Sequence, residues 1–271
     1  MDLLHWLLFG VLPALAAVLL FVGAGGPRFL PLAIAVAICV PFGMDDGWPD
    51  WPWTLDFGHG DARQWLWWCF ACAGCVGATY DLRLLPKWLV APFEVLIVLV
   101  LPWLVSSTLR AGWSFEHCVL MLGAAWFVLA GIWWVLRGAA KAQPGMAVPL
   151  AGTVVLAADT IVLHAQGARL AWHLAGVAAV ALGVSVATTL WRRPFVCGTG
   201  GTLCITIAHA GVLWCARRES HLLSAPSVLA LLAPLALGLG MSRVFADGRT
   251  TGFLVALAVT VALAGAAIAM V

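Results

Sequence analysis

The chain has 271 residues, of which 63% are hydrophobic and 10% are charged, whereas soluble domains average roughly 45–50% apolar and about 25% charged residues. This composition excludes an ordinary soluble domain and indicates a polytopic membrane protein whose main partner is the lipid bilayer. The formal net charge of +2 is too small to indicate nucleic acid as a partner.

Apolar stretches long enough to cross a bilayer, which takes about 20 residues each, recur along the whole sequence. No long polar linker separates them, so we expect an all-α bundle in a single transmembrane domain covering residues 1–271. Ten spans are predicted, at residues 4–24, 28–43, 64–80, 88–108, 116–137, 146–164, 168–190, 199–216, 223–243 and 251–270.

The longest polar interruption is the loop 44–61, which holds five Asp, three Trp, two Pro and no Lys or Arg. Cytoplasmic loops are enriched in Lys and Arg, so this loop is predicted on the non-cytoplasmic face of a bacterial-type inner (plasma) membrane. With an even number of spans, both termini then lie on that face too. Trp48, Trp51 and Trp53 either belong to the interfacial aromatic belt or form a surface that docks a partner protein or a sugar.

Ten spans also allow two inverted halves of five, an architecture similar to that of several secondary-carrier families. A shift of 134 residues aligns the segment 89–92 with 223–226, where Leu, Ala and Pro recur at the same positions. The earlier spans do not keep this register, because the loop 44–61 has no counterpart.

Glu94, Asp159 and His209 are ionisable residues that fall inside predicted spans and are candidates for a function there. A charged group at mid-depth costs roughly 2.5–3.5 kcal/mol, so each needs a reason to be there. They could form a substrate or proton pathway, or each could make a hydrogen bond that packs two helices together. Asp159 and His164 lie about 140° apart around their helix, so we expect Asp159 to find its partner on another helix, with His209 or a Thr as the candidate.

Other patterns are weaker. The histidines gather toward the predicted outer face. A haem bound there would need two of them from different helices as ligands. The sequence identifies no cofactor, which is left as unknown. Cys69, Cys72 and Cys75 lie three residues apart, which favours close helix packing over an iron–sulfur cluster. The segment 198–202, Gly-Thr-Gly-Gly-Thr, either cradles an anion at a helix N-terminus or is a flexible turn. We predict no metal site.

Three functions are consistent with this sequence. The first is a proton- or cation-coupled secondary carrier for a small solute. The second is a non-catalytic membrane subunit or scaffold of a larger envelope complex. The third is a haem- or quinone-handling redox subunit. The chain lacks metal-hydrolase spacings and nucleophile motifs, so an enzyme is not favoured. A carrier would have buried acids beside a cavity, whereas a subunit would have its acids closed off by local hydrogen bonds.

Overall fold

The computed structural model describes residues 6–50, 61–106, 110, 112–142, 147–192, 198–220, 225–241 and 249–270. All regular structure within these ranges is helical, and they contain no strand. The elements are η1 (Leu7–Val11), α2 (Leu12–Val18), η2 (Leu19–Ala24), η3 (Pro27–Phe29), α3 (Leu30–Asp46), α4 (Ala62–Asp81), α5 (Lys87–Val105), α7 (Phe115–Ala142), α8 (Ala147–Ala165), α9 (Arg169–Arg192), α10 (Thr199–Thr206), η4 (Ile207–Gly211), α11 (Val212–Ser220), α12 (Ala225–Leu232), η5 (Ala233–Met241) and α13 (Arg249–Ala269).

Among these residues, six helical stretches are long and apolar enough to cross a membrane: Pro27–Met44, Lys87–Val105, Phe115–Lys141, Ala147–Ala165, Arg169–Thr188 and Thr199–Ala216. The all-α fold class is therefore confirmed and the six apolar helices are compatible with a membrane location, while the count of ten spans stays a prediction. The inverted halves also stay a prediction. Helix α8 packs along α13, and the corresponding pair in the first half, α2 and α7, has no comparable contact among the described residues.

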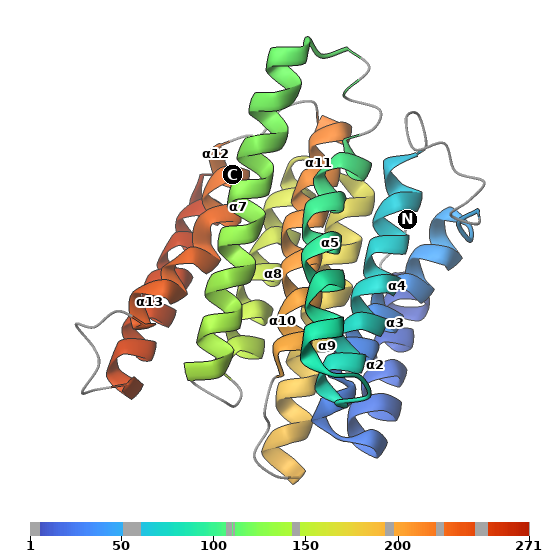
Figure 1. The fold of residues 1–271 in the computed structure, drawn as a ribbon, viewed down its shortest axis with the longest axis vertical. Helices are drawn as coiled ribbons and strands as arrows, with labels where there is room; N and C mark the ends of the chain where they lie inside the picture. Colours follow the sequence, from blue (N-terminus) through green and yellow to red (C-terminus); the bar gives the residue numbers. More distant parts are fainter. Residues whose placement is uncertain are drawn as a thin grey trace.

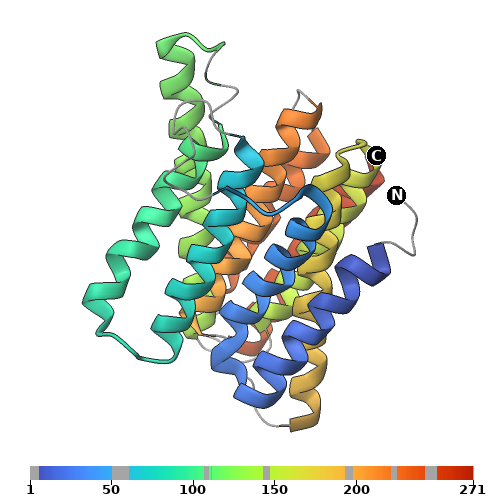
Figure 2. The ribbon, with the colours of Figure 1, turned by 90° about the vertical axis from the view of Figure 1, so that its right-hand side faces the viewer.

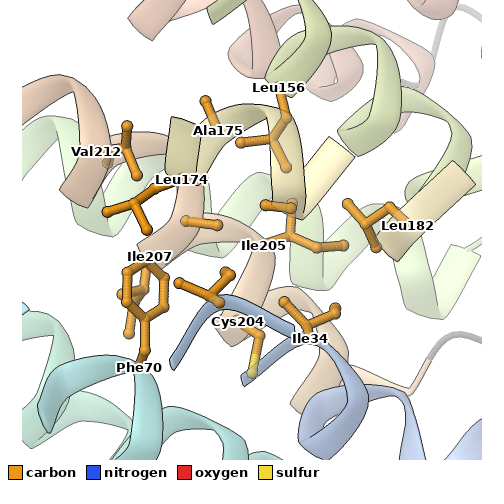
Figure 3. Close-up of a cluster of buried hydrophobic side chains, with 14 of the residues drawn as sticks. Ile34, Phe70, Leu156, Leu174, Ala175, Leu182, Cys204, Ile205, Ile207 and Val212 are labelled. Carbon is orange, nitrogen blue, oxygen red and sulfur yellow. The ribbon is translucent and has the colours of Figure 1, made fainter. Parts of the chain in front are cut away.

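The rod formed by α10, η4 and α11 runs through the centre of the bundle (Figures 1 and 2). In this rod, 89% of the stretch Thr199–Ala216 is buried, against 33% of Phe115–Lys141 in α7. Figure 3 shows Cys204, Ile205 and Ile207 of the rod among buried side chains from α3, α4, α8 and α9. A helix enclosed in this way is where a buried polar group meets the most protein and the least lipid.

Glycines bring α4 close to two of its neighbours, α3 and α10. A Cβ atom on Gly77 would lie 2.7 Å from the carbonyl oxygen of Gly200, and one on Gly200 would overlap the backbone of Gly77. A Cβ on Gly74 would overlap Ala35 of α3. Small residues at such crossings let helix backbones approach, which is the main source of packing energy between helices in lipid.

One end of the bundle, which we call the charged end, carries the basic residues Arg28, Arg83, Lys87, Arg137 and Lys141 together with the acids Asp81 and Glu94. It contains the start of α3, the end of α4, the start of α5, the end of α7 and the start of α10, in the lower part of Figure 1. Tyr80 near the end of α4 contacts Arg137 of α7, and Asp81 contacts the start of α10. These contacts hold helices that are far apart in sequence in one layer.

Candidate functional site

Asp159 and His209 form a fully buried pair in the interior of the bundle. Asp159 lies on α8 and is 0% exposed, while His209 lies on η4 and is 1% exposed. Their Oδ2 and Nδ1 atoms are 2.6 Å apart. The prediction that Asp159 meets a partner on another helix, with His209 as a candidate, is confirmed.

Both ring nitrogens of His209 face acceptors. Nδ1 faces the Asp159 carboxyl group, and Nε2 lies 3.2 Å from the carbonyl oxygen of Leu231 on α12. A neutral imidazole carries a single N–H, so it satisfies both contacts only if Asp159 holds a proton and donates it to Nδ1. An imidazolium satisfies both contacts beside an ionised Asp159. Either way, the two residues together hold one proton more than an ionised acid beside a neutral ring.

The carbonyl of Leu231 is available because the chain after it is irregular. Helix α12 passes at residue 233 into the 3₁₀ segment η5, in which each N–H donates three residues back. The donor to Leu231 in that pattern would be Pro234, which has no N–H. His209 therefore reaches a carbonyl for which the 3₁₀ pattern of η5 supplies no backbone donor.

His209 itself stands on an irregular segment, since η4 is a single π-helical turn between α10 and α11. A π-turn inserts one residue into an α-helix and re-aims the side chains on it, and such turns are frequent at functional sites. The pair thus sits where two helices, α10–α11 and α12–η5, both leave regular geometry.

Little space adjoins the pair. A cavity of about 10 Å³ touches His209 beside Gly152, Ile205 and Pro234, which is close to the minimum volume for one water molecule. A larger apolar cavity of about 140 Å³ lies between α5, α7, α11 and α12. Its lining includes Ala210 and Leu231, the sequence neighbour of His209 and the residue whose carbonyl His209 contacts.

Glu94 belongs to a different cluster, at the charged end. It is 0% exposed, and its Oε2 accepts a hydrogen bond of 2.8 Å from Nη1 of Arg137 on α7. Nη2 of Arg137 lies 3.5 Å from the hydroxyl of Tyr80, and the guanidinium lies over the ring of Trp133 at 5.0 Å. Sequence reasoning gave Glu94 no partner; the structure gives it Arg137 and separates it from the Asp159–His209 pair.

The acidic loop is described only in part. Trp51 and Trp53 lie outside the described residues, so their predicted docking role has no structural account. Trp48 is 65% exposed and makes an edge contact with Trp67 of α4, with ring centroids 6.4 Å apart. This contact is compatible with both predicted roles.

The glycine-rich segment 198–202 does meet an anion, and that anion comes from the protein. The N–H of Gly200 donates to Oδ1 of Asp81 at 3.1 Å, so the last residue of α4 caps the first turn of α10. A Cβ on Gly198 would overlap this carboxyl group. The glycine at that position is thus explained by the close approach of Asp81.

The described residues do not favour a haem or metal centre. Both nitrogens of His209 are already in contact with acceptors, and the described His, Cys, Asp and Glu include no group of three placed to hold a metal ion. Of the three cysteines at this spacing, Cys69 is buried while Cys72 and Cys75 are exposed. Comparison with known proteins found neither a matching family model nor a curated protein of significant similarity.

Proposed function

We propose that this protein is a proton-coupled secondary carrier for a small solute, in which Asp159 and His209 hold the coupling proton. The observation that carries this proposal is the position of the imidazole between two acceptors on two other helices. With the shared proton present, His209 links α8 and α12 at once. When that proton leaves, the ring has one N–H for two acceptors, so one of the two contacts is lost.

This dependence couples protonation to helix packing. An acceptor left without a donor in the apolar interior costs about 1–3 kcal/mol, and more for a carboxylate. Such a cost shifts an equilibrium between two arrangements of a helix by roughly fivefold to a hundredfold. The irregular segments η4 and η5 supply places where the helices can rearrange. A carrier needs such a link between proton occupancy and conformation.

Vesicles test this proposal directly. The purified protein is reconstituted with a pH-sensitive dye inside, and a panel of amino acids, sugars, carboxylates and inorganic ions is added outside. We expect one class of solute to cause proton movement in the same vesicles that take it up. Asp159→Asn preserves the shape and hydrogen bonding of the side chain, so it should remain folded but uncouple proton movement from solute.

Thr160→Val is the matched control. Thr160 follows Asp159 on the same helix, and its hydroxyl donates to the carbonyl of Leu156 within that helix. Removing this polar group leaves the pair intact, so coupling should persist. A fully coupled Asp159→Asn protein would refute the role of this residue.

A second candidate, a non-catalytic membrane subunit, is favoured by one observation. The cavity of about 10 Å³ beside His209 has no room for a solute, and both buried acids contact a basic partner. On this hypothesis the pair only fastens α8 to η4. Asp159→Asn would then be tolerated, Asp159→Leu would disrupt assembly, and a co-purifying partner would be lost with the Leu variant alone.

For topology we propose ten spans with both termini on the non-cytoplasmic side of an inner membrane. Arg28, Arg83 and Lys87 line one pocket at the charged end, Arg137 contacts Tyr80 there, and Lys141 lies in the last turn of α7. This gathering of basic residues supports a cytoplasmic location for that end. Arg63 and Arg169 begin α4 and α9 at the opposite end. A C-terminal reporter that fluoresces only in the cytoplasm should stay dark.

A further inference from the structure

A pocket of about 390 Å³ lies at the charged end, apart from the Asp159–His209 pair. It is formed by the turn before α3, the end of α4, the start of α5 and the start of α10, and its lining comprises Pro27, Arg28, Tyr80, Asp81, Arg83, Lys87, Gly198 and Thr199. Ten residues of helix separate Thr199 from His209, or about 15 Å at 1.5 Å per residue. The pocket is therefore a separate site, and the inference below does not depend on the proposed transport.

The lining of this pocket is strongly positive. It has three cationic side chains, Arg28, Arg83 and Lys87, and a single carboxyl group, Asp81. That carboxyl group already accepts the N–H of Gly200. The ion pairs within the described part of the chain use other cations, namely those of Arg63, Arg137 and His209. Cations that converge in a concave wall attract and concentrate anions.

Arg83 is held in the pocket by an unusual backbone conformation. It is the one non-glycine residue with positive φ in the described chain, at 57°. It follows the C-cap of α4, where Leu84 N–H donates to Thr79 O at 3.1 Å and Arg83 N–H donates to Tyr80 O at 3.2 Å. This is the Schellman pattern, which normally has glycine at that position. Here a strained position carries a guanidinium into the pocket lining.

The donors around the pocket suit a phosphate group. Guanidinium groups bind phosphate oxygens through two parallel N–H bonds, and a Lys ammonium adds a compact charge. Tyr80 and Thr199 bring hydroxyl groups to the same lining, beside the N-terminal end of α10, where the helix dipole favours negative charge. From this combination we propose that the pocket binds a phosphate-bearing anion.

The phosphate group could belong to a lipid headgroup or to a soluble phosphate compound. Leu84, Leu85 and Trp88 stand beside the lining residues of the α4–α5 turn and are exposed by 67%, 49% and 71%. Apolar side chains exposed next to a basic pocket at a helix end are placed as in sites for anionic phospholipid headgroups. A soluble phosphate would use the same cations without contacting these side chains.

The test uses two probes and matched variants of the full chain. Inorganic phosphate is titrated by calorimetry into protein in neutral detergent, with ionic strength held constant by KCl. Phosphatidylglycerol is offered in phosphatidylcholine nanodiscs, and retained lipid is counted by native mass spectrometry. The variants Arg28→Gln, Arg83→Gln and Lys87→Gln each remove one cation from the pocket. Lys141→Gln removes an exposed cation at the same end that does not line it.

We expect the wild type to bind at least one probe, each pocket variant to bind it about tenfold more weakly, and Lys141→Gln to bind it as the wild type does. Saturable binding of inorganic phosphate identifies a soluble ligand, and retention of phosphatidylglycerol alone identifies a lipid headgroup. Arg28 and Lys87 begin helices in ordinary conformations, so their variants keep the test valid if Arg83→Gln unfolds. Binding of neither probe, or equal weakening by Lys141→Gln, overturns the proposal.

Discussion

Arg83 and Gly167 occupy the same position, one residue after the C-cap, in two helix endings of the same type. At the end of α8, Ala168 N–H donates to Leu163 O and Gly167 N–H donates to His164 O, both at 3.0 Å. At the end of α4 the corresponding bonds are made by Leu84 and Arg83. The φ angles are 74° for Gly167 and 57° for Arg83. One ending therefore uses the residue without a Cβ atom, and the other does not.

We expect Arg83→Gly to stabilise the protein, because a left-handed conformation costs a residue with a Cβ atom roughly 1 kcal/mol. Unfolding in detergent, followed by near-UV circular dichroism, should show a higher midpoint. Gly167→Arg imposes the same strain at the opposite end of the bundle and should lower stability by a similar amount. The Arg83→Gly protein should at the same time bind the phosphate probe more weakly. A change of both quantities in the same direction would contradict the role assigned to Arg83.

The Glu94–Arg137 ion pair makes a second prediction. Glu94 is fully buried, so Arg137→Met leaves its charge without a counter-ion, at a cost of about 3–5 kcal/mol. Replacing both residues, with Glu94→Leu and Arg137→Met, removes the charge together with its partner. Stability measured for both single variants and the double variant gives the coupling energy. The double variant should be more stable than Arg137→Met alone. A less stable double variant would show that Glu94 and Arg137 do not act as a coupled ion pair.

The contrast between the two buried pairs shows how far sequence reasoning reaches. Asp159 needed a partner, and the sequence offered His209 as the other ionisable group deep in an apolar stretch, so that contact was predictable. Arg137 is the last residue of the predicted span 116–137. The helix continues to Ala142, so Arg137 lies inside it, where a long side chain reaches Glu94. Forty-three positions separate the two residues, and no local pattern links them.

The basic pocket was not predictable from the sequence either. Its cations come from two short connections, with Arg28 before α3 and both Arg83 and Lys87 between α4 and α5, and neither connection contains a run of basic residues. They converge because α4 fits closely between α3 and α10 through glycines. Periodicity predicts that these helices exist, whereas which helices become neighbours depends on side-chain volumes over the whole bundle. The contact of Asp81 with the glycine-rich segment 198–202 depends on the same packing. The sequence could therefore indicate an anion-binding segment there, but not that Asp81 supplies the anion.

That packing makes a third prediction. Gly200→Ala and Gly77→Ala place a Cβ atom against backbone of the facing helix, which cannot yield as a side chain can. Helices α4 and α10 must separate, and overpacking of this kind costs typically about 1–3 kcal/mol. Gly123→Ala is the control, because nothing lies within 4 Å of a Cβ there, and Ala is the better helix former. Thermal unfolding should show a lower midpoint for the first two variants and an equal or higher one for Gly123→Ala.

The last prediction concerns the pH dependence of anion binding at the charged end. Asp81 lies one residue beyond the predicted span 64–80. Burial raises the pKa of its carboxyl group to about 6, and the backbone N–H groups of Gly200 and Gly201 offset only part of that rise. Above this pH the carboxylate repels an anion in the pocket, and below it the group is neutral. Binding should therefore strengthen as pH falls from about 7.5 to about 5.

Sulfate is the probe for this measurement, because its charge stays constant over that range. The cations that line the pocket with Asp81 are Arg28, Arg83 and Lys87. Glu94 is an acid within electrostatic range of Asp81, and it is paired with Arg137. Titration of sulfate at several pH values should give an affinity that rises roughly tenfold toward low pH. Asp81→Asn retains an oxygen for the N–H of Gly200 while removing the charge, so its sulfate affinity should be high and flat with pH. A wild-type affinity that is equally flat, or one that falls toward low pH, would show that Asp81 does not govern the pocket.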